Sequence, residues 1–326
     1  MSGHATSQRP RVFVARAVFP DIVAQIEAVA DVESNADDAI CSPEQLLERL
    51  GDKQGAFITG SERIDAALLD ACPELKVVST MTVGVDHIDL AACADRGVVV
   101  THAPDVLTET TADFGFALLL AAARQVTAAE RYLREGRWTK WSIDLFAGGD
   151  VHGTTLGIVG MGRIGQAIAR RAAHGFGMRV LYHNRKPVAP EVEQELNAQY
   201  RGLDELLRQS RHVLLTLPYS PQARHLIGER ELALMQPGAT LVNVARGGVV
   251  DEAALARALH AGHLGAAGLD VFEGEPAINP ALLAAPRTVL TPHVASSSIP
   301  TRRAMAQLAV DNLIAVLRGQ PPLTPV

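Results

Sequence analysis

Cysteine is scarce in this chain, with Cys41, Cys72 and Cys93 the only three among 326 residues, and their spacing forms no metal-ligand cluster. A small, odd number of cysteines excludes a disulfide scaffold and favours free thiols in a reducing compartment. A strong excess of one charge is also lacking. The formal net charge of −6 provides no overall attraction for nucleic acid or an anionic membrane. We therefore expect neither a metal site nor a nucleic-acid partner.

Long apolar runs are missing as well. The longest, Phe114 to Ala123, has ten residues, which is too short to span a bilayer. The first ten residues are polar and lack the apolar core of a signal peptide. With 48% hydrophobic and 20% charged residues, the composition is that of a globular protein with two domains of ordinary size. We expect a cytoplasmic protein without a membrane partner.

The most informative pattern is rich in glycine. The segment Gly-Met-Gly-Arg-Ile-Gly begins at Gly160, follows the apolar run Thr155–Val159 and opens a helical pattern. In a dinucleotide site, the first glycine (Gly160) makes the tight turn and the second (Gly162) lets the backbone approach the pyrophosphate. The third (Gly165) lets the helix pack on the strand. The alternative is a tight strand-to-helix turn without a ligand.

The next predicted strand, Arg179–Tyr182, leads into Asn184, Arg185 and Lys186. A site for NAD usually has a carboxylate here, which accepts from the ribose 2′-hydroxyl. This segment has two cations instead, and they suit a 2′-phosphate. The sequence therefore favours NADP(H), with NAD(H) possible. Asn184 could still bind a plain ribose, and a solvated basic turn is the other interpretation.

Apolar strands alternate with amphipathic segments, which predicts an α/β fold of two doubly wound parallel sheets. The expected strands of the first series are Val12–Ala15, Gly55–Thr59, Leu75–Ser79 and Val98–Thr101. Those of the second series are Thr155–Val159, Arg179–Tyr182, His212–Thr216, Thr240–Asn243, Gly265–Asp270 and Thr288–Leu290. We expect a closing helix over 300–318 to pack on the first domain.

A long helix is predicted over 110–135, before an irregular segment that contains Trp138 and Trp141. Two tryptophans in a polar segment are expected to be covered. They could pack on their own domain, line a substrate pocket or lie at a subunit interface, where tryptophan is enriched.

Three strand ends of the second series contain candidate catalytic side chains. Arg246 could bind a carboxylate through its planar guanidinium, although an ion pair with Asp251 or Glu252 is the alternative. The carboxylates Asp270, Glu273 and Glu275 follow the next strand, where one of them could orient a histidine; spacing does not choose among them. His293 follows the last strand and could donate a proton. Parallel strands place these ends along one crevice.

These segments resemble the D-2-hydroxyacid dehydrogenase family and, within it, the glyoxylate/hydroxypyruvate reductases. The resemblance runs over nearly the whole chain and includes Ser79–His87, Thr101–Asp113, Trp138–Trp141, the glycine segment, and the segments around Arg246, Glu275 and His293. It implies a Rossmann dinucleotide-binding domain over 106–294. It also implies a flavodoxin-like substrate domain over 1–105 and 295–326, and a homodimer formed through the helix at 110–135.

The resemblance also implies roles for individual residues. Arg246 would bind the substrate carboxylate, His293 would donate the proton, and Glu275 would be the partner of the histidine. Val83 and Gly84 would bind the carboxylate through backbone N–H groups, and Ser296 and Trp141 would line the same pocket. The residues expected around the cofactor are Gly160, Gly162, Arg163, Ile164, Gly165, Asn184, Arg185, Lys186, Leu217, Pro218, Val244 and Asp270.

The expected activity is NADPH-dependent reduction of glyoxylate to glycolate and of hydroxypyruvate to D-glycerate. One alternative within the same family is reduction of 2-ketogluconate or another larger 2-keto acid. A second alternative, from a different functional class, is a dinucleotide-sensing binding module.

Overall fold

The computed structural model describes residues 9–326; the start of the chain, where a signal peptide was not expected, lies mostly outside the described residues. The chain divides into two compact units. The first unit ends at Leu107 and resumes over Ser298–Val326, and the second unit is Thr108–Ser297. The boundaries predicted from the sequence lay after residues 105 and 294. Among the described residues, no helix has the length and hydropathy needed to cross a membrane.

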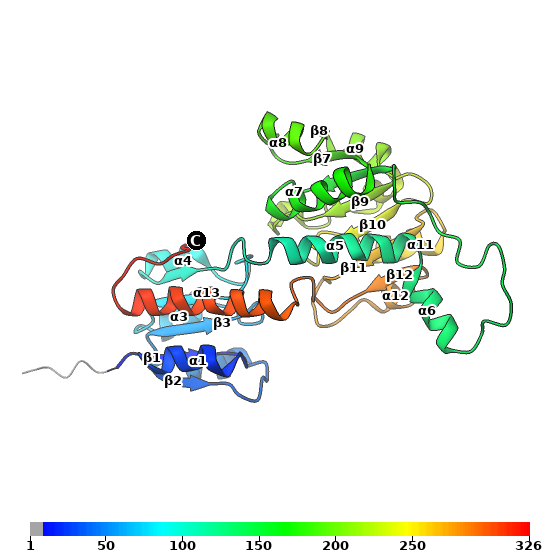
Figure 1. The fold of residues 1–326 in the computed structure, drawn as a ribbon. Coiled ribbons are helices and arrows are strands. Elements are labelled where there is room, and N and C mark those ends of the chain that lie inside the picture. The colour runs from blue at the N-terminus through cyan, green and yellow to red at the C-terminus, as the bar shows by residue number, and fades with distance from the viewer. Residues whose placement is uncertain (1–8) are drawn as a thin grey trace, which may run out of the picture. The chain divides into compact units, whose positions relative to one another are not determined.

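The first unit contains a five-stranded parallel sheet in the order β2-β1-β3-β4-β5. Strands β1, β2 and β3 of this sheet are labelled in Figure 1. Its strands are β1 Arg11–Val14, β2 Asp31–Ser34, β3 Gly55–Ile58, β4 Val77–Thr80 and β5 Val99–Thr101. This is the strand order of flavodoxin-like folds. The strand β2 was not predicted, because it is a polar edge strand whose residues are all at least partly exposed.

The helices of the first unit are α1 Pro20–Glu27, α2 Pro43–Leu50, α3 Ala66–Ala71, α4 Leu90–Asp95 and α13 Ile299–Leu317. Helix α2 begins with a capping box, in which Ser42 accepts from the backbone of Gln45. Helix α13 packs against β3, β4, β5 and α1. Contact with β3 is close, because a Cβ at Gly55 would lie 2.9 Å from Leu313 Cδ1. The last helix of the chain therefore completes the core of its first domain.

The second unit contains a seven-stranded parallel sheet in the order β12-β11-β10-β9-β6-β7-β8. Its strands are β6 Thr155–Val159, β7 Arg179–His183, β8 Ala198–Tyr200, β9 His212–Leu215, β10 Thr240–Asn243, β11 Ala266–Leu269 and β12 Thr288–Leu290. The strand order reverses beside β6, as in dinucleotide-binding folds, and the glycine segment follows β6 directly. The predicted fold class, two parallel-sheet α/β domains, is confirmed.

The helices of the second unit include two that replace the single helix predicted over 110–135. They are α5 Thr108–Ala123 and α6 Val126–Arg134, separated by Gln125 in a left-handed conformation with φ of 54°. Helix α5 packs on β10, β11 and α7, whereas α6 has no buried residue. The others are α7 Arg163–Arg170, the π-helix η1 Arg171–Gly175, α8 Pro190–Glu195, α9 Leu203–Gln209, the 3₁₀ turn η2 Pro221–Ala223, α10 Glu229–Leu234, α11 Glu252–His260 and α12 Pro280–Leu283.

The segment between α6 and β6 forms a long irregular excursion (Figure 1). Trp138 is 56% exposed and Trp141 is 75% exposed. Packing on their own domain, one of the alternatives for the two tryptophans, is therefore wrong for the single chain. Ile143, in the same segment, is 85% exposed as well.

Candidate active site

The glycine segment after β6 is shaped by two close backbone contacts. Gly160 has a φ of 105°, and a Cβ there would lie 2.6 Å from the backbone nitrogen of Leu217. A Cβ at Gly165 would lie 2.2 Å from the carbonyl oxygen of Gly160, which also accepts a hydrogen bond of 2.6 Å from Thr216 Oγ1. The first and third glycines are thus required by the turn itself and by the packing of α7 on it.

The second glycine faces open space. Gly162 is the N-cap of α7, and a Cβ built there meets no heavy atom within 4 Å. No side chain caps this helix, and a helix N-terminus attracts an anion through its N–H groups and its dipole. A space next to Gly162 at a helix N-terminus is what a dinucleotide pyrophosphate requires. The residues present therefore fit the nicotinamide dinucleotide implied by the sequence.

Substitution of Gly162 by Ala is expected to weaken dinucleotide binding about tenfold or more, because the added methyl group displaces the phosphates from the N–H groups. The fold should be unaffected, since the φ of −77° at Gly162 is accessible to Ala. Isothermal titration calorimetry with the coenzyme and thermal unfolding measure the two effects. Gly202→Ala is the matched control, because Gly202 is also a helix N-cap with open space around its Cβ position. Equal affinities for both variants would contradict this placement of the pyrophosphate.

The three candidate residues in the turn after β7 have two different roles. Asn184 Oδ1 accepts a hydrogen bond of 2.7 Å from the backbone of Met161, so this amide oxygen supports the glycine segment. Arg185 and Lys186 are exposed, and within residues 9–326 neither forms a hydrogen bond or an ion pair. Both cations therefore remain available for a phosphate group.

The other residues predicted around the cofactor lie near the carboxyl ends of neighbouring strands. Leu217 and Pro218 follow β9, Val244 follows β10, and Arg163 and Ile164 form the first turn of α7. Because these strands are parallel, their carboxyl ends share one edge of the sheet.

His293 lies in a turn just after β12, in a left-handed conformation with φ of 53°. Its backbone N–H donates to the carbonyl oxygen of Asp270 at 2.8 Å, which fixes this unusual geometry. Its Nδ1 lies 2.5 Å from Glu275 Oε1. The carboxylate thus holds one ring nitrogen and leaves Nε2 on the opposite side of a half-exposed ring. This arrangement suits a proton donor.

Glu275 is held in its ionised form by this pairing. Burial raises the pKa of the carboxyl group, but the hydrogen bond to His293 and the nearby positive charges, including Arg246, outweigh burial and leave the pKa below its usual range. Its second oxygen accepts from the backbone of Phe272 at 3.1 Å. Glu275 can therefore orient the His293 ring at neutral pH.

The structure separates the three carboxylates that spacing could not distinguish. Glu273 binds Arg224 Nη2 and His225 Nε2, each at 2.9 Å. Asp270 holds the turn described below, and among the described residues Glu275 is the carboxylate paired with His293. The partner implied by the resemblance is thus the one that geometry selects.

Asp270 has no exposed surface, and both its carboxylate oxygens are used inside the protein. Oδ1 accepts from Thr291 Oγ1 at 2.7 Å and from Val294 N at 2.9 Å, and Oδ2 accepts from Ala295 N at 2.8 Å. The sequence prediction placed Asp270 around the cofactor. In the structure, its side chain holds the turn that contains His293.

Arg246 follows β10 in a turn that packs on the segment containing Glu275. A Cβ at Gly247 would lie 1.8 Å from the carbonyl oxygen of Phe272, so only glycine allows this approach. Buried Asn243 braces the turn by donating to the carbonyl of Arg246 at 3.0 Å and accepting from Ala245 N at 3.0 Å. Arg246, Glu275 and His293 are thus positioned by neighbouring strand ends of one sheet.

Glu252 was considered from the sequence only as an ion-pair partner of Arg246. It is 6% exposed, and its Oε1 accepts from the backbone of Glu273 at 2.6 Å. Burial, and then the charge of Glu273, raise the pKa of Glu252. Glu252 and Glu273 are 21 residues apart in the sequence, so spacing gave no signal of this contact.

The remaining predicted residues are distributed over both units. Val83 and Gly84 follow β4 in the first unit. Ser296 is half-buried and belongs to the second unit, although the sequence prediction assigned it to the substrate domain. Trp141 is in the exposed excursion described above.

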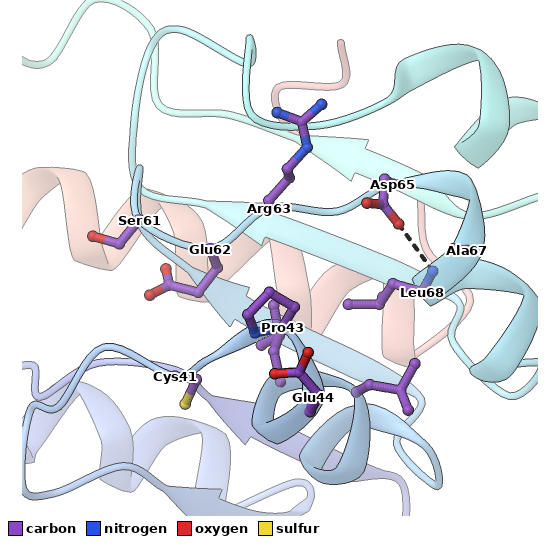
Figure 2. A pocket seen from close by; sticks show the side chains of 11 residues that line it. Cys41, Pro43, Glu44, Ser61, Glu62, Arg63, Asp65, Ala67 and Leu68 are labelled. Carbon is purple, nitrogen blue, oxygen red and sulfur yellow. Dashed lines mark hydrogen bonds between the residues drawn. The ribbon is translucent and has the colours of Figure 1, made fainter. Parts of the chain in front are cut away.

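A cavity of about 420 Å³ lies in the first unit, between α2 and the segment Ser61–Leu68 (Figure 2). Its lining includes none of the predicted site residues. Buried Glu62, at its edge, uses Oε2 to accept from the backbone and hydroxyl of Thr59, at 2.7 and 2.9 Å. The candidate active site therefore does not coincide with this cavity.

Comparison with known proteins decides the family. The sequence model of the family described as "D-isomer specific 2-hydroxyacid dehydrogenase, NAD binding domain" matches residues 116–295. The chain belongs to the D-isomer specific 2-hydroxyacid dehydrogenases. The matched region contains the glycine segment, Arg246, Glu275 and His293.

Several known proteins are similar to this one over nearly the whole chain. The glyoxylate reductases of Thermococcus onnurineus and Pyrococcus horikoshii are each 45% identical, over 97% of this chain and 95% of theirs. The crystal structure of the TT0316 protein from Thermus thermophilus has a TM-score of 0.89 at 44% identity, covering 97% of this chain and 99% of that one. An NADPH-dependent glyoxylate/hydroxypyruvate reductase from Sinorhizobium meliloti, solved with NADP and malonate, has a TM-score of 0.83 at 36% identity, covering 98% and 97%.

The family assignment makes this protein an NAD(P)-dependent oxidoreductase, as expected from the glycine segment. The predicted resemblance and the predicted enzyme class are both confirmed.

Proposed function

We propose that this dehydrogenase reduces glyoxylate to glycolate and hydroxypyruvate to D-glycerate, with NADPH as the preferred coenzyme and NADH as a poorer one. The observation that carries the proposal is the His293–Glu275 pair, 2.5 Å apart, next to the turn of Arg246. The names of the similar reductases indicate that the substrate is a small keto acid.

Each residue has one task in the proposed reaction. The guanidinium of Arg246 binds the substrate carboxylate, with the N–H groups of Val83 and Gly84 as further donors. His293 gives the proton from Nε2 to the carbonyl oxygen, while Glu275 keeps the ring oriented and stabilises its charged form. When bound, the reduced nicotinamide supplies the hydride that adds to C2. Ser296 and Trp141 would line the substrate pocket.

The proposal is tested by following the near-ultraviolet absorbance of NADPH and NADH separately against glyoxylate, hydroxypyruvate, pyruvate and 2-ketogluconate. Faster NADPH oxidation with the two small acids supports it. Preference for 2-ketogluconate would keep the mechanism and change the substrate. Tight dinucleotide binding without turnover of any acid would favour the binding-module alternative.

The basic turn supplies a separate test of coenzyme preference. The double variant Arg185→Ala with Lys186→Ala is expected to raise the KM for NADPH about tenfold or more, because two charged donors to the 2′-phosphate are lost. NADH, which lacks this phosphate, serves as the matched control and should be affected less than about twofold. Parallel losses with both coenzymes would show that the turn does not recognise the 2′-phosphate.

We also propose a cytoplasmic homodimer formed through 110–135 and the excursion that follows. Uncovered apolar side chains support this: Val126 is 52% exposed and Leu133 is 58% exposed on α6, in addition to the two tryptophans. Such a surface is typical of an interface. Light scattering of the purified protein measures its mass in solution.

A further inference from the structure

The segment Thr82–Gly84, which follows β4, has its peptide planes held by His102 and Ala103, which come directly after the neighbouring strand β5. The carbonyl oxygen of Thr82 accepts from the backbone of Ala103 at 2.9 Å. The carbonyl oxygen of Val83 accepts from Nδ1 of His102 at 2.9 Å. Because a peptide group is planar and trans, each bond also sets the direction of the N–H on the other side of the same plane. Ala103 thereby aims the N–H of Val83, and His102 aims the N–H of Gly84.

The His102 ring has a defined role in this arrangement. A carbonyl oxygen only accepts, so Nδ1 carries the proton and is the donor to Val83. The following peptide is held as well, since Thr82 Oγ1 donates to the carbonyl oxygen of Gly84 at 2.7 Å. The N–H groups assigned to the substrate carboxylate under the proposed function are therefore oriented from outside the segment that contains them.

His102 is in turn held by the C-terminal tail, residues Leu323–Val326. The backbone N–H of His102 donates to the carbonyl of Thr324 at 3.2 Å, and Thr324 Oγ1 donates to the carbonyl of His102 at 2.6 Å. Val326 N donates to the carbonyl of Val100 at 3.0 Å, so the tail lies along the outer edge of β5.

The tail is anchored in the core by Asn312 of α13, which is fully buried. Its Oδ1 accepts from the backbones of Leu323 at 2.8 Å and Thr324 at 2.9 Å. Its Nδ2 donates to Thr324 Oγ1 and to the carbonyl of Leu308, each at 2.8 Å. All the hydrogen-bonding capacity of the amide is used, so the tail has one defined register on β5.

We propose that His102 and the C-terminal tail are positioning elements of the substrate site: the chain Asn312–Thr324–His102–Val83 aims the backbone N–H group of Gly84 at the carboxylate of the 2-keto acid, next to the N–H group of Val83 that Ala103 aims. The inference rests on the proposed function, which assigns these N–H groups to the substrate. Loss of the His102 bond should weaken carboxylate binding in the ground state and the transition state alike. Such uniform weakening raises KM and leaves kcat nearly unchanged.

The test compares two variants of His102 that differ in one donor. His102→Leu removes the donor, and His102→Asn keeps an N–H at the position of Nδ1. His102→Leu is expected to raise the KM for glyoxylate about tenfold, with kcat changed less than about threefold, since roughly one hydrogen bond is lost. His102→Asn should restore most of the loss. The KM for coenzyme should stay at the wild-type value in both.

Thr324→Val tests the tail with little change of volume, because it removes the hydroxyl that joins Asn312 to His102. Like His102→Leu, it should raise the KM for glyoxylate. Thr154→Val is the matched control: its hydroxyl likewise donates to a backbone carbonyl, that of Val151 at 2.7 Å, but it lies in the second unit and outside the proposed chain. It should behave as wild type.

An unchanged KM in folded His102→Leu, or a loss that His102→Asn does not restore, would overturn the proposal. A lower melting temperature with unchanged KM would reduce His102 and the tail to a structural role. Failure of the proposed function is seen separately, as wild-type protein that reduces no keto acid. In that case the inference is tested by calorimetric titration with oxalate. Weaker oxalate binding by His102→Leu than by the wild-type protein supports the inference, and equal binding overturns it.

Discussion

Replacement of His293 by Asn is expected to lower kcat for the keto acid by about 10²-fold or more, the scale of general acid catalysis. Asn is chosen because His293 has a φ of 53°, a left-handed conformation that Asn adopts more readily than most residues. The variant should therefore keep the turn and lose only the titratable donor next to Glu275. Steady-state kinetics at saturating coenzyme, together with a coenzyme titration, separate lost chemistry from lost binding.

The chain offers a close control in His225. This histidine also has a left-handed backbone, with φ of 50°, and its Nε2 lies 2.9 Å from a carboxylate, Glu273. His225→Asn repeats the same substitution in the same unit and should keep kcat within about threefold, below the range of lost acid–base catalysis. Equal losses in both variants, or near-normal turnover in folded His293→Asn, would remove His293 from the role of proton donor.

Replacement of Asp270 by Asn is expected to lower the free energy of unfolding by about 3 kcal/mol, since charge-assisted bonds in a buried site are lost and one polar group is left unsatisfied. Asp270 accepts three hydrogen bonds from the turn of His293, and the NH₂ group of Asn would face at least one of those donors. Turnover should fall together with stability, because the same turn positions His293. Urea unfolding monitored by far-ultraviolet circular dichroism measures the change.

Asp89→Asn is the control for this substitution. Asp89 is the N-cap of α4 and accepts from Ala92 N at 2.9 Å, a task that Asn performs equally well. Its effect should stay below about 0.5 kcal/mol, as for surface substitutions in general. If Asp270→Asn were as stable as Asp89→Asn, the buried carboxylate would not be what holds the His293 turn.

The interior strands of both sheets were predictable because parallel strands buried on both faces are continuous apolar runs. The two missed strands, β2 and β8, are short edge strands with sequences Asp-Val-Glu-Ser and Ala-Gln-Tyr. An edge strand buries less and needs no apolar run, so its sequence resembles that of a loop. Their pairing with β1 and β7 becomes visible only once the sheets are built.

The helix over 110–135 shows a different limit of sequence reasoning. Neither glycine nor proline marks the break between α5 and α6, where Gln125 adopts a left-handed conformation. The break occurs where the chain leaves the apolar core. Before it, α5 buries eight of its residues, and after it α6 buries none. Tertiary packing, which the local pattern does not contain, ends the first helix.

The candidate site was predictable as a set of strand ends, but not as a set of contacts. Parallel strands place Arg246, the acidic segment and His293 at one edge of the sheet, and this follows from the sequence alone. The pairing of His293 with Glu275 depends on Glu273 being held by Arg224 and His225, and on Asp270 being turned inward. The contacts of Glu273 and Asp270 involve residues that are distant in the sequence. The spacing of the three carboxylates therefore could not predict which of them pairs with His293.

The placement of α13 has a consequence for the order in which the protein can fold during synthesis. Domains generally fold as units as they leave the ribosome, beginning at the N-terminus. Here the sheet of the first unit packs against a helix encoded at the end of the chain, Ile299–Leu317, while the second unit is one uninterrupted segment. The nascent chain can therefore complete its coenzyme-binding domain first. The part of the first unit that is made earlier must wait, with β3 and β4 uncovered on one face, until α13 has been synthesised.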